Sequence, residues 1–384
     1  MTTRFSRRRF VAGVGTAALA SSLTFTKRSE AAGKIEEVKT ISHLQHRYHG
    51  WPTLARRNNG ELLVVCSGDR ESHVCPFGRV EMMRSRDDGS SWTWPEVIMD
   101  SPIDDRDAGV IETAKGTLLV TTFTSLAYVD TLRRAERDGS WDASRLQRWQ
   151  AAHQRLNEQQ RQAALGVWIK RSTNDGVTWS GRYDCLVDSP HGPIQLRDGR
   201  LLYAGKDLWR EPHRVGVCQS TDDGKSWQWL AEIPARAGDD QENYHELHAV
   251  ETASGRLIAH VRNHNPKNNR ETLQSESEDG GKTWSPPHEI GVWGLPSHLL
   301  RLRDGRLLMS YGHRRAPLGN QARISEDDGR SWSEPIIVYG DGASGDLGYP
   351  STAELADGSL LTVWYELLKG SSFAQLRQAR WRIV

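Results

Sequence analysis

A short alternation of a polar turn and an apolar strand recurs along the whole chain. In each copy a polar residue and a glycine precede one further residue and a pair of large aliphatic residues, and the glycines are Gly60, Gly116, Gly199, Gly255, Gly305 and Gly358. Such a glycine between apolar runs is a strong signal for a β-hairpin, here called a Gly-turn. The glycines lie 56, 83, 56, 50 and 53 residues apart. Six copies at this spacing predict an all-β, six-bladed β-propeller.

A second motif, Ser-x-Asp-x-Gly-x-x-Trp, starts at Ser85, Ser220, Ser277 and Ser325, and a fifth copy from Ser172 has Asn174 in place of Asp. The Asp or Asn side chain can bond nearby backbone amides, the Gly can adopt a positive φ, and the Trp can pack beneath the turn. We therefore interpret these acids as turn-holding rather than catalytic. We expect the Gly-turn to join the first and second strands of a blade and this motif to join the third and fourth, with the two turns at opposite ends.

The even spacing is broken between Thr124 and Trp168. Residues 142–161 are rich in helix formers and contain no Gly or Pro, and Leu146, Trp149 and Leu156 form an apolar stripe. We predict a helical insertion at about residues 126–166, in the second-to-third blade region. The pattern alone leaves open whether it is a lid over a pocket or a surface helix.

Composition narrows the class of protein. Lys and Arg number 50 against 49 Asp and Glu, a formal net charge of +1, which argues against nucleic acid as a partner and against a polybasic membrane anchor. No apolar run after the first 30 residues is long enough to span a bilayer. We therefore expect no membrane insertion once the N-terminal leader has been removed.

The N-terminus has the order of an export signal. Arg7, Arg8 and Arg9 precede Phe10 and an apolar stretch over residues 11–25, and small residues follow at 31–32. Paired arginines before Phe resemble the twin-arginine signal, which exports folded proteins. We predict a signal peptide at residues 1–32, a propeller domain at 33–384, and a periplasmic or extracellular location.

The cysteines do not indicate a metal site. Cys66, Cys75, Cys185 and Cys218 show no C-x-x-C spacing, so a zinc site is not expected, and we predict no cofactor. In an oxidising compartment Cys66 and Cys75 could form a disulfide, but separate buried thiols fit the sequence equally well.

Residues just before the first strand of a blade and just after its second strand lie at the end of the blade away from the Gly-turn. Six blades therefore bring these residues into a ring around the central channel. These windows contain eight of the 14 histidines. A converging polar ring at a channel is the default active-site hypothesis. The candidate binding residues are His49, Trp51, Arg70, Asp105, Arg106, His191, His248, Arg262, His313, Arg314 and Arg315.

With six blades and five such motifs, which match its Asp-boxes, the chain resembles the sialidase superfamily over essentially the whole mature length. The resemblance implies a glycoside hydrolase that acts on terminal acidic sugars of glycans. It implies a tyrosine nucleophile at Tyr349, paired with Glu246, while Arg262 and Arg315 hold the substrate carboxylate. A neutral tyrosine is not repelled by that carboxylate, and we expect the nearby arginines to lower the pKa of the tyrosine.

Two departures from the family pattern concern the first blade. The family's first arginine is replaced by Gly50, unless Arg47 or Arg106 substitutes for it. The loop after the second strand has no aligned acid/base aspartate, although Arg70 fits the family's arginine. The proton donor is therefore predicted to be Glu71 or His73, since histidine can act as a general acid near neutral pH.

Two further functions stay open at this point. The His-rich mouth could serve a different, uronate-containing glycan, by hydrolysis or by elimination, sometimes with a metal. Alternatively, the chain is a non-catalytic carbohydrate-binding propeller, which the loss of one arginine and of the aligned aspartate would support.

Overall fold

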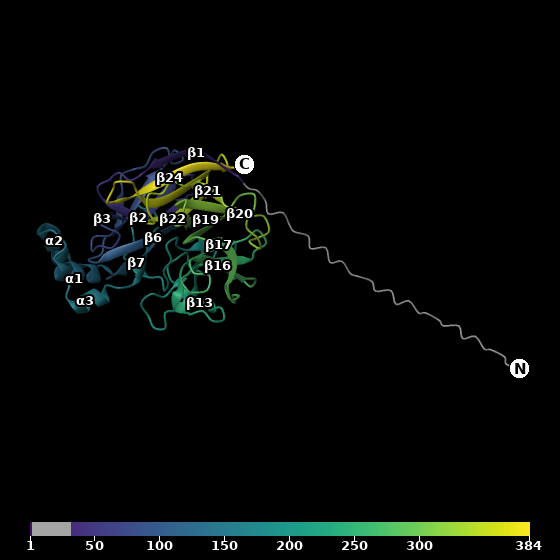
Figure 1. The fold of residues 1–384 in the computed structure, drawn as a ribbon, viewed down its shortest axis with the longest axis horizontal. Coiled ribbons are helices and arrows are strands. Elements are labelled where there is room, and N and C mark those ends of the chain that lie inside the picture. The colour runs from purple at the N-terminus through teal and green to yellow at the C-terminus, as the bar shows by residue number, and fades with distance from the viewer. Residues whose placement is uncertain (2–31) are drawn as a thin grey trace.

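The computed structural model describes Met1 and residues 32–384, so the predicted signal peptide lies almost entirely outside the described residues. The described chain forms six four-stranded antiparallel sheets, with a group of helices projecting at one side (Figure 1). This confirms the six-bladed β-propeller. Each sheet is built from consecutive strands that run from the central axis outward, except the last.

The first three blades follow one another in chain order. Blade 1 consists of β2 (Tyr48–Arg56), β3 (Leu62–Arg70), β4 (Arg79–Ser85) and β5 (Glu96–Met99). Blade 2 consists of β6 (Asp104–Glu112), β7 (Leu118–Ser125), β8 (Val167–Ser172) and β9 (Tyr183–Asp184). Blade 3 consists of β10 (Ile194–Gln195), β11 (Leu201–Lys206), β12 (Val215–Ser220) and β13 (Gln228–Glu232).

The remaining three blades complete the ring. Blade 4 follows the short 3₁₀ helix η1 (Gln241–Asn243) and consists of β14 (Tyr244–Glu251), β15 (Leu257–Asn263), β16 (Glu271–Ser277) and β17 (His288–Trp293). Blade 5 consists of β18 (Ser297–Arg301), β19 (Leu307–His313), β20 (Gly319–Ser325) and β21 (Ile336–Tyr339). Blade 6 consists of β22 (Leu347–Glu354), β23 (Leu360–Leu367), β24 (Ala374–Ile383) and β1 (Gly33–Thr40).

The outer strand of blade 6 closes the propeller. Strand β1 pairs antiparallel with β24, from Gly33 opposite Ile383 to Thr40 opposite Arg377. The third and fourth strands of this blade therefore come from distant parts of the sequence and no hairpin joins them. This explains why the chain has six Gly-turns but only five Asp-boxes.

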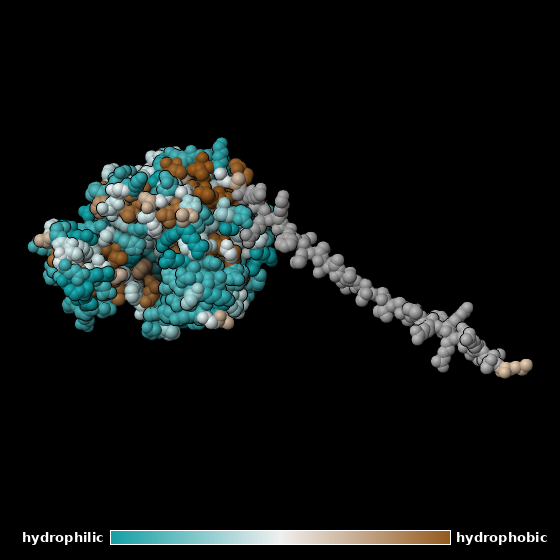
Figure 2. Space-filling view, viewed as in Figure 1, coloured by the Kyte–Doolittle hydropathy of each residue, from teal (hydrophilic) through white to brown (hydrophobic). Residues whose placement is uncertain are grey.

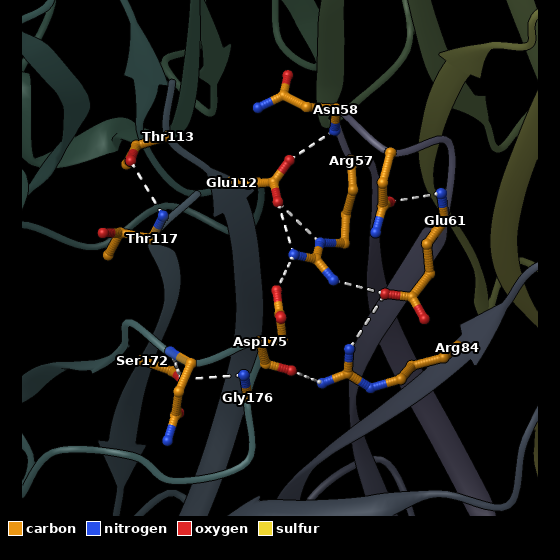
Figure 3. Close-up of polar contacts among 12 residues, drawn as sticks. Arg57, Asn58, Glu61, Arg84, Glu112, Thr113, Thr117, Ser172, Asp175 and Gly176 are labelled. Carbon is orange, nitrogen blue, oxygen red and sulfur yellow. Dashed lines mark hydrogen bonds and ion pairs between the residues drawn. The ribbon is translucent and has the colours of Figure 1, made fainter. Parts of the chain in front are cut away.

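The expectation that the two kinds of turn lie at opposite ends of a blade is wrong. Antiparallel strands alternate in direction, so the first-to-second and third-to-fourth connections lie at the same end. Figure 3 shows this end of blades 1 and 2, where Arg57 of one Gly-turn bonds Asp175 of the next blade's Asp-box at 2.5 Å. The ring of candidate residues still lies at the opposite end of the blades, here called the mouth end, because its placement is inferred from the Gly-turns alone.

The Asp-boxes have the structural role expected of them. In the first, the Ser85 hydroxyl accepts the Gly89 amide at 2.8 Å, and Asp87 accepts the Ser91 amide at 2.9 Å. The hydrogen bonds from Ser91 lower the pKa of Asp87 to about 2. The same Ser–Gly bond recurs in the four other boxes.

The helical insertion lies inside blade 2, between β7 and β8, and comprises α1 (Tyr128–Asp138), α2 (Ala143–Gln154) and α3 (Glu158–Ala163). Trp149 of the predicted stripe is fully buried and packs in one cluster with Tyr128 and with Cys75 of blade 1. Glu71 accepts hydrogen bonds from Arg148 at 3.0 Å and from the Trp149 indole at 2.9 Å. The insertion is thus fixed against the β3–β4 connection, beside the mouth end.

The structure also bears on the cysteines and on the possibility of a membrane-spanning helix. The four cysteines are buried free thiols, so Cys66 and Cys75 form no disulfide. No helix within the described residues has the length and apolar character needed to cross a membrane. The face shown in Figure 2 is mostly hydrophilic, with scattered apolar patches.

The buried arginine at the Gly-turn end predicts a measurable link between blades. Arg57 is buried and bonds Glu61 at 2.7 Å and Glu112 at 2.7 Å, as well as the exposed Asp175. R57A would therefore leave three carboxylates without this partner, two of them with buried side chains (Figure 3). We expect R57A to lower the free energy of unfolding by about 3 kcal/mol in urea titrations. R86A, which removes an exposed partner of the same Glu61, should cost less than about 1 kcal/mol. Equal effects of the two substitutions would contradict this assignment.

Candidate active site

Four of the six inner strands carry the same backbone irregularity at the mouth end. Trp51, Asp107, Glu246 and Tyr349 have positive φ values of 54°, 42°, 42° and 55°, each at a break in the register with the second strand. Each lies nine residues before the glycine of its Gly-turn (51 and 60, 107 and 116, 246 and 255, 349 and 358). Left-handed backbone is unfavourable for such residues and collects at functional sites, where bulges re-aim side chains. These four residues therefore occupy equivalent positions around the axis.

Tyr349, Glu246 and Arg262 meet at the mouth, although they come from blades 6 and 4. The Tyr349 hydroxyl donates a hydrogen bond to Glu246 Oε1 at 2.6 Å. Arg262 Nη1 donates to the Tyr349 hydroxyl at 3.1 Å and also bonds Glu246 Oε2. All three side chains are largely buried. The arrangement joins a potential nucleophile, a proton acceptor and a cation in one group.

The pKa of Tyr349 shifts in the direction opposite to the one expected from the nearby arginines. Burial and the charge of Glu246 raise the pKa of Tyr349 well above its usual value, and Arg262 offsets only part of this. Burial would also raise the pKa of Glu246, but the charge and hydrogen bond of Arg262 hold it below its usual value. Tyr349 is therefore a neutral phenol beside an ionised Glu246, so it must lose its proton as it attacks.

Asp107 is a member of this group that the sequence reasoning did not select. Burial raises its pKa to about 7, with a further contribution from Glu246 that Arg106 and Arg262 oppose. Its Oδ1 atom is buried without a hydrogen-bond partner in the described structure. The sequence contained one usable signal, the spacing of nine residues to Gly116.

The position of the missing family arginine is filled by aromatic rings. A Cβ atom on Gly50 would lie 3.2 Å from the Tyr48 ring and 3.9 Å from the Tyr365 ring. Of the two proposed substitutes, Arg47 pairs with Asp69 at 3.2 Å, and the guanidinium of Arg106 lies 4.3 Å from the centroid of the Trp51 ring.

Asp346 connects three side chains at the blade 1 side of the mouth. It accepts hydrogen bonds from the hydroxyls of Tyr48 and Tyr365 at 3.0 and 3.1 Å. It also lies 3.0 Å from Nδ1 of His73, whose side chain is 48% exposed. Asp346 thus orients a partly open histidine. Glu71, the other predicted proton donor, instead has both carboxylate oxygens hydrogen-bonded to side chains of α2.

Three predicted binding residues are enclosed rather than open to the mouth. Arg70 is fully buried and pairs with Asp104 at 2.6 Å. His49 lies against Glu81 at 3.7 Å, and burial lowers the pKa of His49 to about 4. Asp105 accepts the Ser101 amide at 2.7 Å. These three side chains support the walls of the mouth.

Two of the predicted histidines lie deeper on the axis. The rings of His191, His248 and His298 are 4.7–5.3 Å apart and line a separate cavity of about 370 Å³. The backbone amide of Leu299 donates to Nδ1 of His248 at 2.9 Å, so Nε2 of that ring carries the proton. Within residues 32–384, no group of three or more His, Cys, Asp or Glu side chains is arranged to hold a metal ion.

A cationic pocket of about 320 Å³ adjoins Arg262. Its lining residues are Arg262, His264, Arg270, Trp293, Leu295, Gly312, Arg314 and Gly345. Of the two adjacent candidates in blade 5, Arg314 lines this pocket, while Arg315 stacks on Trp293 at its rim, 3.8 Å from the ring centroid. His313 also lies against Trp293, at 5.5 Å. The residue beside Arg262 is therefore Arg314 rather than Arg315.

The fold and its five Asp-boxes define a sialidase-like propeller, and comparison with known proteins agrees. Residues 143–362 match the BNR repeat-like domain. The chain belongs to this family. No curated protein matches the chain.

Solved structures of the same fold have low sequence identity. A protein of unknown function from Dyadobacter fermentans is 23% identical with a TM-score of 0.72, over 92% of this chain and 100% of that one. The Hadza microbial sialidase Hz136 is 19% identical with a TM-score of 0.62, over 86% and 65%. The intramolecular trans-sialidase from Ruminococcus gnavus, in complex with oseltamivir carboxylate, is 14% identical with a TM-score of 0.63, over 90% and 97%. At these identities the likeness establishes the fold alone.

The raised pKa of Asp107 predicts a pH-dependent effect on stability. Its pKa is about 7 in the folded protein against an ordinary 3.8, so ionising Asp107 opposes folding, and stability is lost as the pH rises between these values. D107N removes the ionisable carboxyl group and with it this loss of stability. We expect D107N to gain stability over the wild type, by an amount that grows from about pH 4 to about pH 7 and then levels off.

Urea unfolding at several pH values measures this difference. The matched control is D87N, which removes an exposed carboxylate whose pKa is lowered to about 2. D87N should therefore have the opposite sign, a loss of stability that is already complete above about pH 5. A difference between D107N and wild type that does not vary with pH would contradict the raised pKa of Asp107.

Proposed function

We propose that the chain is an exported, sialidase-like glycoside hydrolase that removes terminal acidic sugars from glycans. The observation that carries the proposal is the hydrogen-bonded group of Tyr349, Glu246 and Arg262 at the mouth. The predicted signal at residues 1–32 supports export, since glycans of this kind are found outside the cytoplasm.

In the first chemical step, the Tyr349 oxygen attacks the anomeric carbon and the glycosidic C–O bond breaks. The phenol proton passes to Glu246, which accepts it over the existing 2.6 Å hydrogen bond. The leaving oxygen takes a proton from a general acid. In the second step, the deprotonated general acid takes a proton from water, the water oxygen attacks the anomeric carbon, the C–O bond to tyrosine breaks, and the tyrosine recovers its proton from Glu246. A tyrosine nucleophile is a known exception to the two-carboxylate scheme of glycosidases.

The choice of tyrosine follows from the charge of the substrate. An acidic sugar with a carboxylate on its reacting carbon would repel an Asp or Glu nucleophile, whereas a neutral phenol is not repelled. Arg262 and Arg314 line the adjacent pocket and provide two guanidinium groups for that carboxylate. Arg262 also stabilises the negative charge that develops on the tyrosine oxygen during attack.

The structure favours His73 over Glu71 as the general acid. The His73 ring is partly open and is oriented by Asp346, an arrangement that allows a proton to be delivered from the other ring nitrogen. Glu71 has both oxygens bonded to α2. Asp107 is the buried alternative, because a carboxyl group with a pKa of about 7 still holds its proton in mildly acidic conditions.

A second candidate function, the hydrolysis or elimination of a uronate-containing glycan, is favoured by one observation. The mouth lacks the family's first arginine, and Tyr48 and Tyr365 fill its place, so the substrate carboxylate is held by fewer cations. The same assay separates the two functions: purified protein is incubated with sialyl and uronyl glycosides, and the products are analysed. Ultraviolet absorbance of an unsaturated product identifies elimination.

Removal of the phenol hydroxyl predicts loss of turnover. Y349F should lower kcat by at least about a thousandfold, since Phe cannot form the glycosyl bond, while the fold and glycan binding persist. The control is Y339F, which removes a hydroxyl from the outer strand β21, where it donates to the Asp341 carbonyl at 2.9 Å, and should leave kcat unchanged. Turnover is measured on the best glycoside from the screen. A fully active Y349F protein would refute the mechanism.

The general acid is identified by the dependence on the leaving group. A nitrophenolate leaves without protonation, whereas a sugar hydroxyl does not, so H73A should lose about a hundredfold or more of kcat/KM on the natural linkage and far less on a nitrophenyl glycoside. E71Q should instead weaken the contact with α2 and lower the melting temperature without such selectivity. Equal losses of H73A on both substrates would exclude His73 as the proton donor, and D107N would then be compared in the same way.

A further inference from the structure

The arginines around the cationic pocket differ from most others in the protein because they lack carboxylate partners. Arg262 is paired with Glu246, but within the described residues Arg270, Arg314 and Arg315 form no ion pair. No acidic residue lines the pocket. Two guanidinium groups without ion pairs line the pocket, those of Arg270 and Arg314, and a third, that of Arg315, stacks on the lining residue Trp293. Such a group of cations favours oxyanions, which arginine binds through parallel N–H donors. The pocket therefore has more positive charge than a single carboxylate requires.

These cations lie at two depths. Arg314 is half-buried and is held in place by a hydrogen bond from its Nε to the Leu347 carbonyl at 2.9 Å. Arg270 and Arg315 are exposed at the rim. A substrate carboxylate that reaches Arg262 and Arg314 therefore leaves the rim arginines free for a group farther from the reacting carbon.

Trp293 organises the rim. The guanidinium of Arg315 stacks on its ring at 3.8 Å from the centroid, which fixes the cation while its N–H groups remain free in their plane. Arg270 is held alongside, because its carbonyl accepts the amide of Gly294, the residue after Trp293, at 3.2 Å. The guanidinium of Arg315 is thus positioned before any ligand arrives, which reduces the entropic cost of binding, and the backbone of Arg270 is fixed beside it.

We propose that Arg270, Arg315 and Trp293 form a second anion subsite, which binds a carboxylate or sulfate on the sugar next to the reacting one. This inference rests on the proposed function and deepens it, since it names polyanionic glycans as the substrate class. A neutral neighbouring sugar would leave the subsite empty, whereas a charged one would engage both rim arginines.

The first test uses a probe that does not depend on catalysis. Binding of a fluorescein-labelled heparin tetrasaccharide, which carries carboxylates and sulfates, is measured by fluorescence polarisation at low and physiological salt. R270A/R315A should raise Kd by at least about tenfold and flatten the salt dependence. The matched control, R56A/R330A, removes two exposed arginines at the Gly-turn end and should stay within about twofold of wild type. Equal losses in both double variants would overturn the subsite.

The second test identifies which oxyanion is preferred. Calorimetry on the Y349F chain compares 3′-sialyllactose with its 6-sulfated form and with disialyl-lactose, so that the second charge is a sulfate in one arm and a carboxylate in the other. We expect at least one doubly charged glycan to bind about tenfold more tightly, with this preference lost in Y349F/R270A/R315A. Absence of any preference would overturn the proposal. If no sialoside binds, the sialidase-type function fails, and the heparin result alone decides on the subsite.

Discussion

The register of the inner strands is the constraint on which the site depends. In blades 1, 2, 4 and 6 the residue nine positions before the turn glycine has left-handed backbone, and this places Trp51, Asp107, Glu246 and Tyr349 at equivalent positions on the axis. A shift of one residue in any of these hairpins would turn the side chain toward the other face of its sheet. The Gly-turns and Asp-boxes at the far end fix that register, and the contacts between Arg57, Glu112 and Asp175 tie the register of one blade to that of the next. The chemistry at the mouth is thus held by turns at the opposite end of the molecule.

Burial then decides the charge of each group at the mouth. Glu246 stays ionised because Arg262 is bonded to it, whereas Asp107, with no hydrogen bond to its Oδ1 atom, has a pKa near 7. Burial also keeps Tyr349 neutral, since a phenolate beside Glu246 would place two negative charges in a medium of low dielectric constant. Before substrate binds, the one full negative charge of Glu246 is balanced by Arg262, and Arg314 remains available for the anion of the ligand. The resting site is therefore prepared for one incoming negative charge near the reacting carbon.

The sequence predicted most of the fold because the turns are local. The Gly-turns and Asp-boxes depend on side chains within eight residues of one another, so they can be recognised without knowledge of tertiary contacts. The association of Tyr349, Glu246 and Arg262 could also be anticipated, since each stands at a fixed place relative to a Gly-turn. Asp107 was missed because it belongs to a run of acidic residues from Asp104 onward, and only the bulge shows which one faces the axis. The choice between Arg314 and Arg315 depends on the direction of the chain after β19, and the fate of Glu71 depends on an insertion 77 residues away; neither is visible in a local pattern.

The two sides of the mouth have opposite chemical character, and the replacement at Gly50 explains why. On the blade 1 side, the rings of Tyr48 and Tyr365 occupy the space beside Gly50, and Asp346 accepts hydrogen bonds from both hydroxyls and contacts His73. On the side of blades 4 and 5, Arg262 is paired with Glu246, whereas Arg270 and Arg314 line the pocket and form no ion pair within the described residues. In the proposed function, the anion of an acidic ligand is therefore placed beside Arg262 and Arg314, where the pocket is lined by unpaired guanidinium groups. This asymmetry leaves His73, the proposed proton donor, on the side away from the anion, where the proposed mechanism requires the leaving oxygen of the glycan.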